Sequence, residues 1–68
     1  MRMSELNIPR SQIEYLIESY VYVARNKDIF YMKLEGYTYE ELAEMYNLST
    51  VRIKEIVKEC LDKIAKHI

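Results

Sequence analysis

The sequence predicts an all-α protein, and three observations support that class. Apolar residues recur at the spacing of amphipathic helices along almost the whole chain. The 68 residues include one glycine and one proline, too few for the turns that a strand-rich fold would need. Half of the residues are apolar, as in an ordinary folded protein. We therefore expect one small helical domain, near the lower size limit for an independent core.

The first half of the chain predicts two helices after an N-terminal tail of residues 1–8. The first is expected over residues 9–25, where Pro9 suits the first turn and Asn7 is a candidate cap. A second, shorter helix is expected over residues 26–34 and should end at Gly36, because glycine readily takes the left-handed conformation that closes helices. The buried face of the first helix would consist of Ile13, Leu16, Ile17, Tyr20 and Ala24.

Two more helices follow, separated by a short break. Thr38 and Glu41 have the spacing of a capping box, in which each side chain accepts the backbone N–H of the other residue. The helix after Thr38 should stop at Asn47, which tolerates a left-handed turn, and Ser49 is placed to cap a last helix. The last helix has the cleanest periodicity in the chain, with an inner face of Ile53, Ile56, Val57, Cys60, Leu61, Ile64 and Ile68.

The break between these helices indicates a tight corner rather than a loop. Leu48 stands at its centre, where an apolar side chain can point back into the core and hold the corner. Ala43 is small enough to let the two helices approach each other, and it would face Ile53 and Ile56. This spacing is typical of a helix-turn-helix, whose second helix can enter a DNA major groove. The alternative is an ordinary αα-hairpin.

From the second helix onward the sequence resembles a known family. The stretch LEGYTYEELAEMYNLSTVRIKEIVKECLDKI is similar to region 4, the C-terminal promoter-recognition region of bacterial sigma-70-type factors, and to related sigma-like regulators. The resemblance runs from about Asn26 to Ala65, so residues 26–68 form the region 4-like part. It implies that Thr38 to Tyr46 form the supporting helix and that the recognition helix starts at Ser49.

The resemblance also implies which residues contact DNA. Family members read the promoter's upstream hexamer with side chains just after the turn, which here are Thr50, Val51, Lys54 and Glu55. The family usually places charged or amide side chains, often Arg, where this chain has Thr50 and Val51. The full set of candidate DNA-binding residues is Ser49, Thr50, Val51, Arg52, Lys54, Glu55 and Lys58. The sequence lacks the sigma segments that grip polymerase and melt DNA, so we expect a stand-alone regulator, of a kind found on phages and mobile elements.

Charge is unevenly distributed along the chain. The formal net charge is −1, whereas DNA-binding domains are usually strongly basic. Residues 1–48 carry five Lys or Arg against eight Asp or Glu, and residues 49–68 carry five against three, so only the last helix is positive. Its outward side carries Arg52, Lys54, Lys58, Lys63 and Lys66 together with Glu55, Glu59 and Asp62. We expect a monomer to bind DNA weakly; an ordinary solvated helix face is the alternative.

The seven tyrosines are the other unusual feature of the composition. Tyr20, Tyr37 and Tyr46 fit core positions with their hydroxyls at the surface. Tyr15 and Tyr22, seven residues apart, would form one stripe on the first helix, nearly opposite its core face. Such a stripe suits a protein interface, either in a homodimer or with a larger partner. The alternative is two half-exposed surface tyrosines.

No catalytic, metal or cofactor site is expected. His67 is the only histidine, and we expect it to be solvent-exposed near the C-terminal end. Cys60 is the only cysteine and falls on the apolar face of the last helix, where a thiol behaves as a small hydrophobe. A lone cysteine favours a reducing, cytoplasmic setting, and no apolar run is long enough for a membrane span or a signal peptide.

Two functions from different classes remain. The first is a small DNA-binding transcriptional regulator, dimeric, whose partner is double-stranded DNA. The second is a protein-interaction module of the same fold that binds RNA polymerase or another protein through its acidic half, in particular Glu40, Glu41 and Glu44. An enzyme is not expected.

Overall fold

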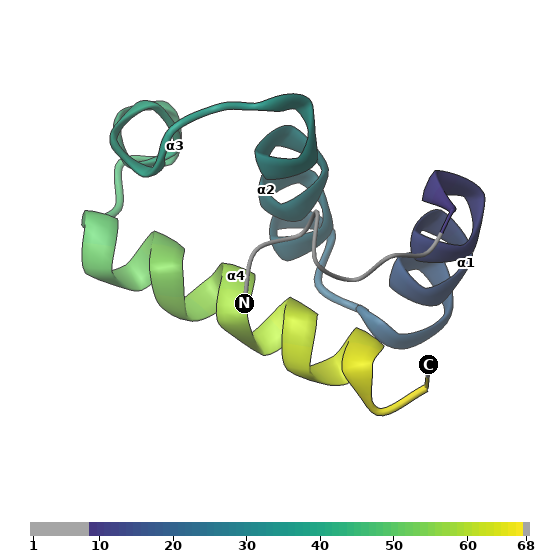
Figure 1. Cartoon of the computed structure of the whole chain (residues 1–68). Helices are drawn as coiled ribbons and strands as arrows, with labels where there is room; N and C mark the ends of the chain where they lie inside the picture. The colour runs from purple at the N-terminus through teal and green to yellow at the C-terminus, as the bar shows by residue number, and fades with distance from the viewer. Residues whose placement is uncertain (1–8, 68) are drawn as a thin grey trace.

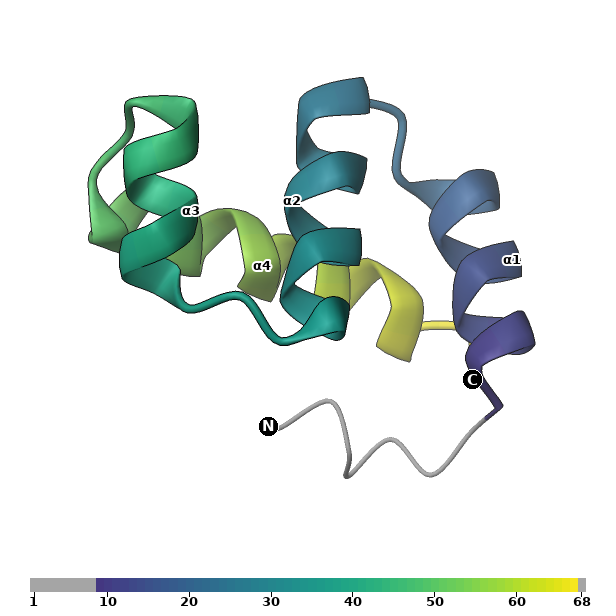
Figure 2. The same ribbon diagram turned by 90° about the horizontal axis from the view of Figure 1, so that it is seen from above.

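The computed structural model describes residues 9–67, and it contains four helices within that range. They are α1 (Arg10–Tyr20), α2 (Ala24–Glu35), α3 (Tyr39–Tyr46) and α4 (Thr50–Ala65). Figure 1 shows α4, the longest helix, running beneath the other three. Seen from above in Figure 2, α3, α2 and α1 stand side by side and each crosses α4. The described residues include no strand, so the predicted all-α class is confirmed.

The first helix is shorter than the sequence predicts. It begins after Pro9, whose extended backbone makes it the N-cap, and no side chain caps this end. It ends at Tyr20, so the predicted extension to residue 25 is wrong. The proposed cap Asn7, like the rest of the tail of residues 1–8, lies outside the described residues.

An extended link accounts for the early end of α1. Val21 and Val23 both take extended backbone conformations, which β-branched residues favour. The side chain of Val21 is only 2% exposed, so the extended link still contributes to the core. Ala24, expected on the buried face of the first helix, instead begins α2 and is exposed. The apolar pattern therefore continues across the break although the helix does not.

Gly36 closes α2 as predicted, with a left-handed φ of 108°. The N–H of Gly36 donates to Lys33 O, and the N–H of Tyr37 donates to Met32 O at 3.2 Å, which satisfies carbonyls that the helix leaves open. Tyr37 then lies on the connection to α3 and is 39% exposed, so its predicted core position is wrong. Tyr39 packs against the core instead.

The capping box at the start of α3 is confirmed. The Glu41 N–H donates to Thr38 Oγ1 at 3.1 Å, and the Thr38 N–H donates to Glu41 Oε1 at 2.9 Å. Hydrogen bonds with the backbone and then with the side chain of Thr38 hold the pKa of Glu41 below its ordinary value. Because both side chains satisfy backbone donors, the N-terminal end of α3 is capped by its own residues.

The corner between α3 and α4 is also confirmed. Asn47 takes a left-handed conformation with φ of 54°, and Ser49 Oγ accepts the N–H of Arg52 at 3.0 Å. The N–H of Leu48 donates to Ala43 O at 2.9 Å, and the Leu48 side chain packs half-buried against the core. The two helices are therefore joined by three residues, each with a defined backbone role.

The core draws on all four helices. Its buried members are Ile13, Leu16, Ile17, Val21, Ile29, Phe30, Leu42, Ala43, Ile53, Ile56, Val57, Cys60 and Ile64. The predicted inner face of α4 is thus buried, except that Leu61 is half-buried and Ile68 lies outside the described residues. Tyr20 and Tyr46 pack half-buried against this core, as predicted. The hydroxyl of Tyr46 is 3.5 Å from Met32 Sδ and so turns inward rather than to the surface.

Glu18 connects α1 to α2 through two polar contacts. Lys27 Nζ is 3.1 Å from Glu18 Oε1, and the Tyr31 hydroxyl donates to Glu18 Oε2 at 2.8 Å. Burial, with the bond to Glu18, raises the pKa of Tyr31 to about 12. A further ion pair joins Arg10 and Glu35 at 2.8 Å. These exposed pairs orient α1 more than they stabilise the fold, because surface ion pairs contribute little.

We expect Ala43→Leu to destabilise the protein by ~1–3 kcal/mol, because the larger side chain overpacks the contact between α3 and α4. Thermal unfolding should show this as a fall in Tm of several degrees. Asn47→Gly is the control: glycine adopts φ of 54° without strain, so Tm should change little. A Tm that is unchanged in Ala43→Leu and strongly lowered in Asn47→Gly would contradict this account of the corner.

Cys60 predicts a loss of stability at alkaline pH. Burial raises the pKa of its thiol from 9.0 to about 11. In the unfolded chain the Cys60 thiol ionises at a lower pH than in the folded protein. Its contribution to the free energy of unfolding is therefore complete below pH 9 and is lost as the pH rises towards 11. Urea unfolding at pH 7.5 and 10.5 should show a smaller alkaline loss in Cys60→Ala than in the wild type. Equal losses in the two proteins would contradict the assignment.

Candidate nucleic-acid interface

The α3–α4 corner places the start of α4 at one end of the molecule (Figure 1). Ile53 and Ile56 are fully buried and hold α4 against the bundle, while the small Ala43 lets α3 lie close to it. The opposite side of α4 is left uncovered from its first turn. The geometry therefore combines a rigid corner with an exposed helix start.

The candidate DNA-binding residues all lie on α4 or at its cap. Val51 is 66% exposed and so presents an apolar side chain on the surface at the start of α4. Thr50 and Arg52 are half-buried, at the edges of the exposed face. The remaining four are exposed: Ser49, Lys54, Glu55 and Lys58. The fold thus brings the predicted set together on one surface.

Arg52 is already engaged within the protein. Its Nη1 lies 3.7 Å from Glu55 Oε1 and 3.8 Å from Glu59 Oε1. These contacts direct the guanidinium along α4 and offset its charge. We call Arg52, Glu55 and Glu59 the acidic flank of α4, since together they carry one more negative than positive charge.

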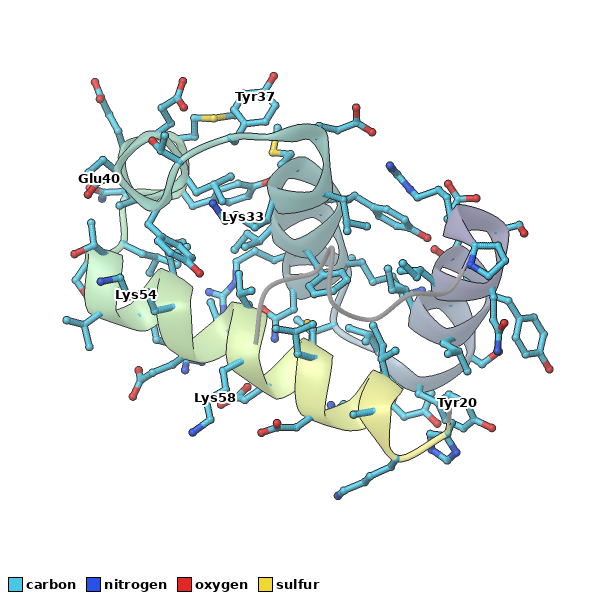
Figure 3. The ribbon with its side chains drawn as sticks, in the orientation of Figure 1. Tyr20, Lys33, Tyr37, Glu40, Lys54 and Lys58 are labelled. Atoms are coloured by element: carbon cyan, nitrogen blue, oxygen red, sulfur yellow. The ribbon has the colours of Figure 1, made fainter. Side chains whose placement is uncertain are left out.

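The other side of α4 is basic, and the sequence did not reveal how it is built. Lys33 Nζ, from α2, lies 4.3 Å from the ring centroid of Tyr39, and Lys54 Nζ lies 5.5 Å from the same centroid. Lys58 follows Lys54 one turn further along α4, and Figure 3 shows it pointing away from the bundle. We call Lys33, Lys54 and Lys58 the basic flank. No local pattern could have identified it, because its members come from two helices and meet around a tyrosine on a third.

The acidic residues of α3 form a separate surface. Glu40, Glu41 and Glu44 are all exposed. Glu41 is occupied in the capping box, which leaves Glu40 and Glu44 for outside contacts. Figure 3 shows Glu40 at the end of the molecule, away from Lys58.

Tyr15 and Tyr22 do not share a helix. Because α1 ends at Tyr20, Tyr22 lies in the extended link, and the helical stripe predicted from their spacing is wrong. Both side chains are nevertheless highly exposed, at 68% and 78%. An interface at these residues therefore remains a proposal that depends on their exposure alone.

His67 makes a contact that the sequence did not predict. Its ring stacks on that of Tyr20, with the centroids 3.6 Å apart and the planes 5° from parallel. The residue is still exposed, as expected. The stacking ties the end of α4 to the end of α1, far from the basic flank.

Taken together, the α3–α4 corner and the exposed start of α4 define a helix-turn-helix protein. The family model for sigma-70, region 4 matches residues 21–66, and the chain belongs to this family. The match covers α2, α3 and α4 and leaves α1 outside. Region 4 is a DNA-binding helix-turn-helix region, which supports DNA binding. Comparisons with curated proteins and with solved structures gave no match.

Within residues 9–67, none of the helices has the length and apolar character needed to cross a lipid bilayer.

Proposed function

We propose that this chain is a transcriptional regulator that places the first turns of α4 in the major groove of double-stranded DNA. The observation that supports this most is the exposed start of α4, held by the Asn47 corner in a family of DNA-binding regions. A B-DNA major groove, about 12 Å wide, admits one α-helix. The exposed face of α4 carries both polar and apolar groups, which can contact the base edges in that groove.

The exposed side chains suggest a division of roles. Val51 offers an apolar contact to thymine methyl groups, and Glu55 can accept a hydrogen bond from a cytosine amino group. Lys54 can reach base edges or phosphates, and Lys58 is better placed for phosphates because it lies a turn further along. The oxygen of Ser49 already accepts the Arg52 N–H, but its hydroxyl proton can still be donated to a phosphate of the DNA backbone.

A protein partner is the second candidate function. The net charge of −1 limits general attraction to DNA, and Glu40 and Glu44 remain exposed on α3. A basic surface of RNA polymerase, or of another component of the transcription machinery, would complement them. This function predicts that Glu40→Lys with Glu44→Lys abolishes the protein contact, whereas changes on α4 leave it intact.

The DNA-binding proposal predicts different effects for two cations of α4. Lys58→Ala should weaken binding to all sequences alike and reduce the slope of log Kd against log salt by about 1. Arg52→Ala should reduce it less, because Glu55 and Glu59 already offset the Arg52 charge. Gel-shift titrations from ~50 to ~200 mM salt, on a duplex selected from a random pool, measure both. No wild-type binding at ~50 mM salt, where phosphate contacts count most, would favour the protein partner.

The exposed tyrosines lead to a proposal about assembly. Tyr15 and Tyr22 supply large, weakly polar area of the kind that interfaces use, and a second copy of the chain would double the few phosphate contacts available. Tyr15→Glu with Tyr22→Glu should convert a dimer to a monomer in sedimentation, with unchanged helical circular dichroism. A wild type that stays monomeric at high concentration would exclude the homodimer.

A further inference from the structure

The basic flank of α4 concentrates positive charge around one aromatic ring. The ammonium groups of Lys33 and Lys54 both lie within 5.5 Å of the Tyr39 ring centroid. A tyrosine face attracts cations but brings no counter-charge. Among residues 9–67, neither lysine forms an ion pair, and neither does Lys58. Like charges gathered around one ring repel each other, and a nearby anion offsets that repulsion.

Lys33 is held in place before any ligand arrives. Its Nζ donates to Tyr37 O at 3.0 Å and lies over the Tyr39 ring, and the residue is half-buried. The bonds to Thr38 lower the pKa of Glu41 most, and the charge of Lys33 lowers it further. The Glu41 carboxylate is bound to Thr38 and closes the capping box, so Lys33 keeps donors for another acceptor.

A groove of about 270 Å³ lies beside these amines. Its apolar lining comes from Val57, Leu61 and Ala65, and its polar lining from Tyr39, Lys54, Lys58 and Asp62. Two positive charges, those of Lys54 and Lys58, face the single negative charge of Asp62 in this lining, and Lys33 adjoins the groove through the Tyr39 ring. An apolar floor with mainly basic walls matches a sugar–phosphate backbone, which alternates apolar sugar faces with anionic phosphates.

We propose that the basic flank and Tyr39 bind the phosphates of one DNA strand while the start of α4 contacts bases in the DNA major groove. This inference rests on the proposed DNA-binding function and adds Lys33 and Tyr39, which lie outside α4, to the contact surface. The acidic flank lies along the other edge of the exposed face of α4, where the carboxylates of Glu55 and Glu59 outnumber the guanidinium of Arg52 and disfavour close phosphates. The protein therefore grips DNA asymmetrically, with its phosphate contacts concentrated on one strand.

Lys33→Gln tests the proposal, because glutamine removes the charge and can still donate to the Tyr37 carbonyl. Lys63→Gln is the matched control: it makes the same charge change on α4, at a residue that neither lines the groove nor lies over the Tyr39 ring. On one selected duplex, Lys33→Gln should lower the salt slope by about 1, so its affinity defect should shrink about threefold between ~50 and ~200 mM salt. Lys63→Gln should keep the wild-type slope. Circular dichroism establishes that both variants fold.

Neutral methylphosphonate linkages, introduced singly in each strand of the same duplex, locate the contact. Wild-type binding should be weakened by neighbouring linkages on one strand, and Lys33→Gln should lose sensitivity at one of them. If the wild type binds DNA and Lys33→Gln shows the wild-type salt slope and the wild-type linkage profile, phosphate binding by the basic flank is wrong and the proposed function still stands. If the wild type does not bind DNA at ~50 mM salt, both phosphate binding by the basic flank and the proposed function are wrong.

Discussion

The left-handed turn at Asn47 is the constraint on which the rest of the molecule depends. It is the only described non-glycine residue with positive φ. It ends α3 before Leu48 and Ser49, which would otherwise continue the same helix. The reversal lets the Leu48 N–H reach Ala43 O, turns Leu48 against the core and frees Ser49 to cap α4. The exposure of the first turns of α4 follows directly, because the buried face of this helix is fixed by the same corner.

The near-neutral net charge is less informative than the position of the charges on α4. Glu55 and Glu59 hold Arg52 along one side of the helix, while Lys54 lies on the other side over the Tyr39 ring. Exposed charges act on a phosphate over about 10 Å at moderate salt, so the positions of nearby charges matter more than the net charge of the whole chain. A chain with a net charge of −1 can therefore still present a surface that attracts a polyanion.

Sequence patterns predicted what is locally encoded and missed what is not. The capping box at Thr38, the turn at Asn47 and the cap at Ser49 each involve residues within four positions, and all three are present. The break after Tyr20 was missed because Val21 enters the core from an extended link as a helical residue would. The Tyr39 cluster was missed for another reason: it forms only when three helices come together, and no spacing along the chain records that event.

The helix outside the family match is part of the core. Ile13, Leu16 and Ile17 of α1 are at most 6% exposed, and α1 contacts α4. Burial of each such side chain contributes roughly 1.5–3 kcal/mol, so their sum is comparable with the whole stability of a small domain. Removing α1 would leave the region 4-like part with an uncovered apolar surface rather than a finished fold. Since α1 covers the core with one face, its exposed Tyr15 is free to face a partner without disturbing α4.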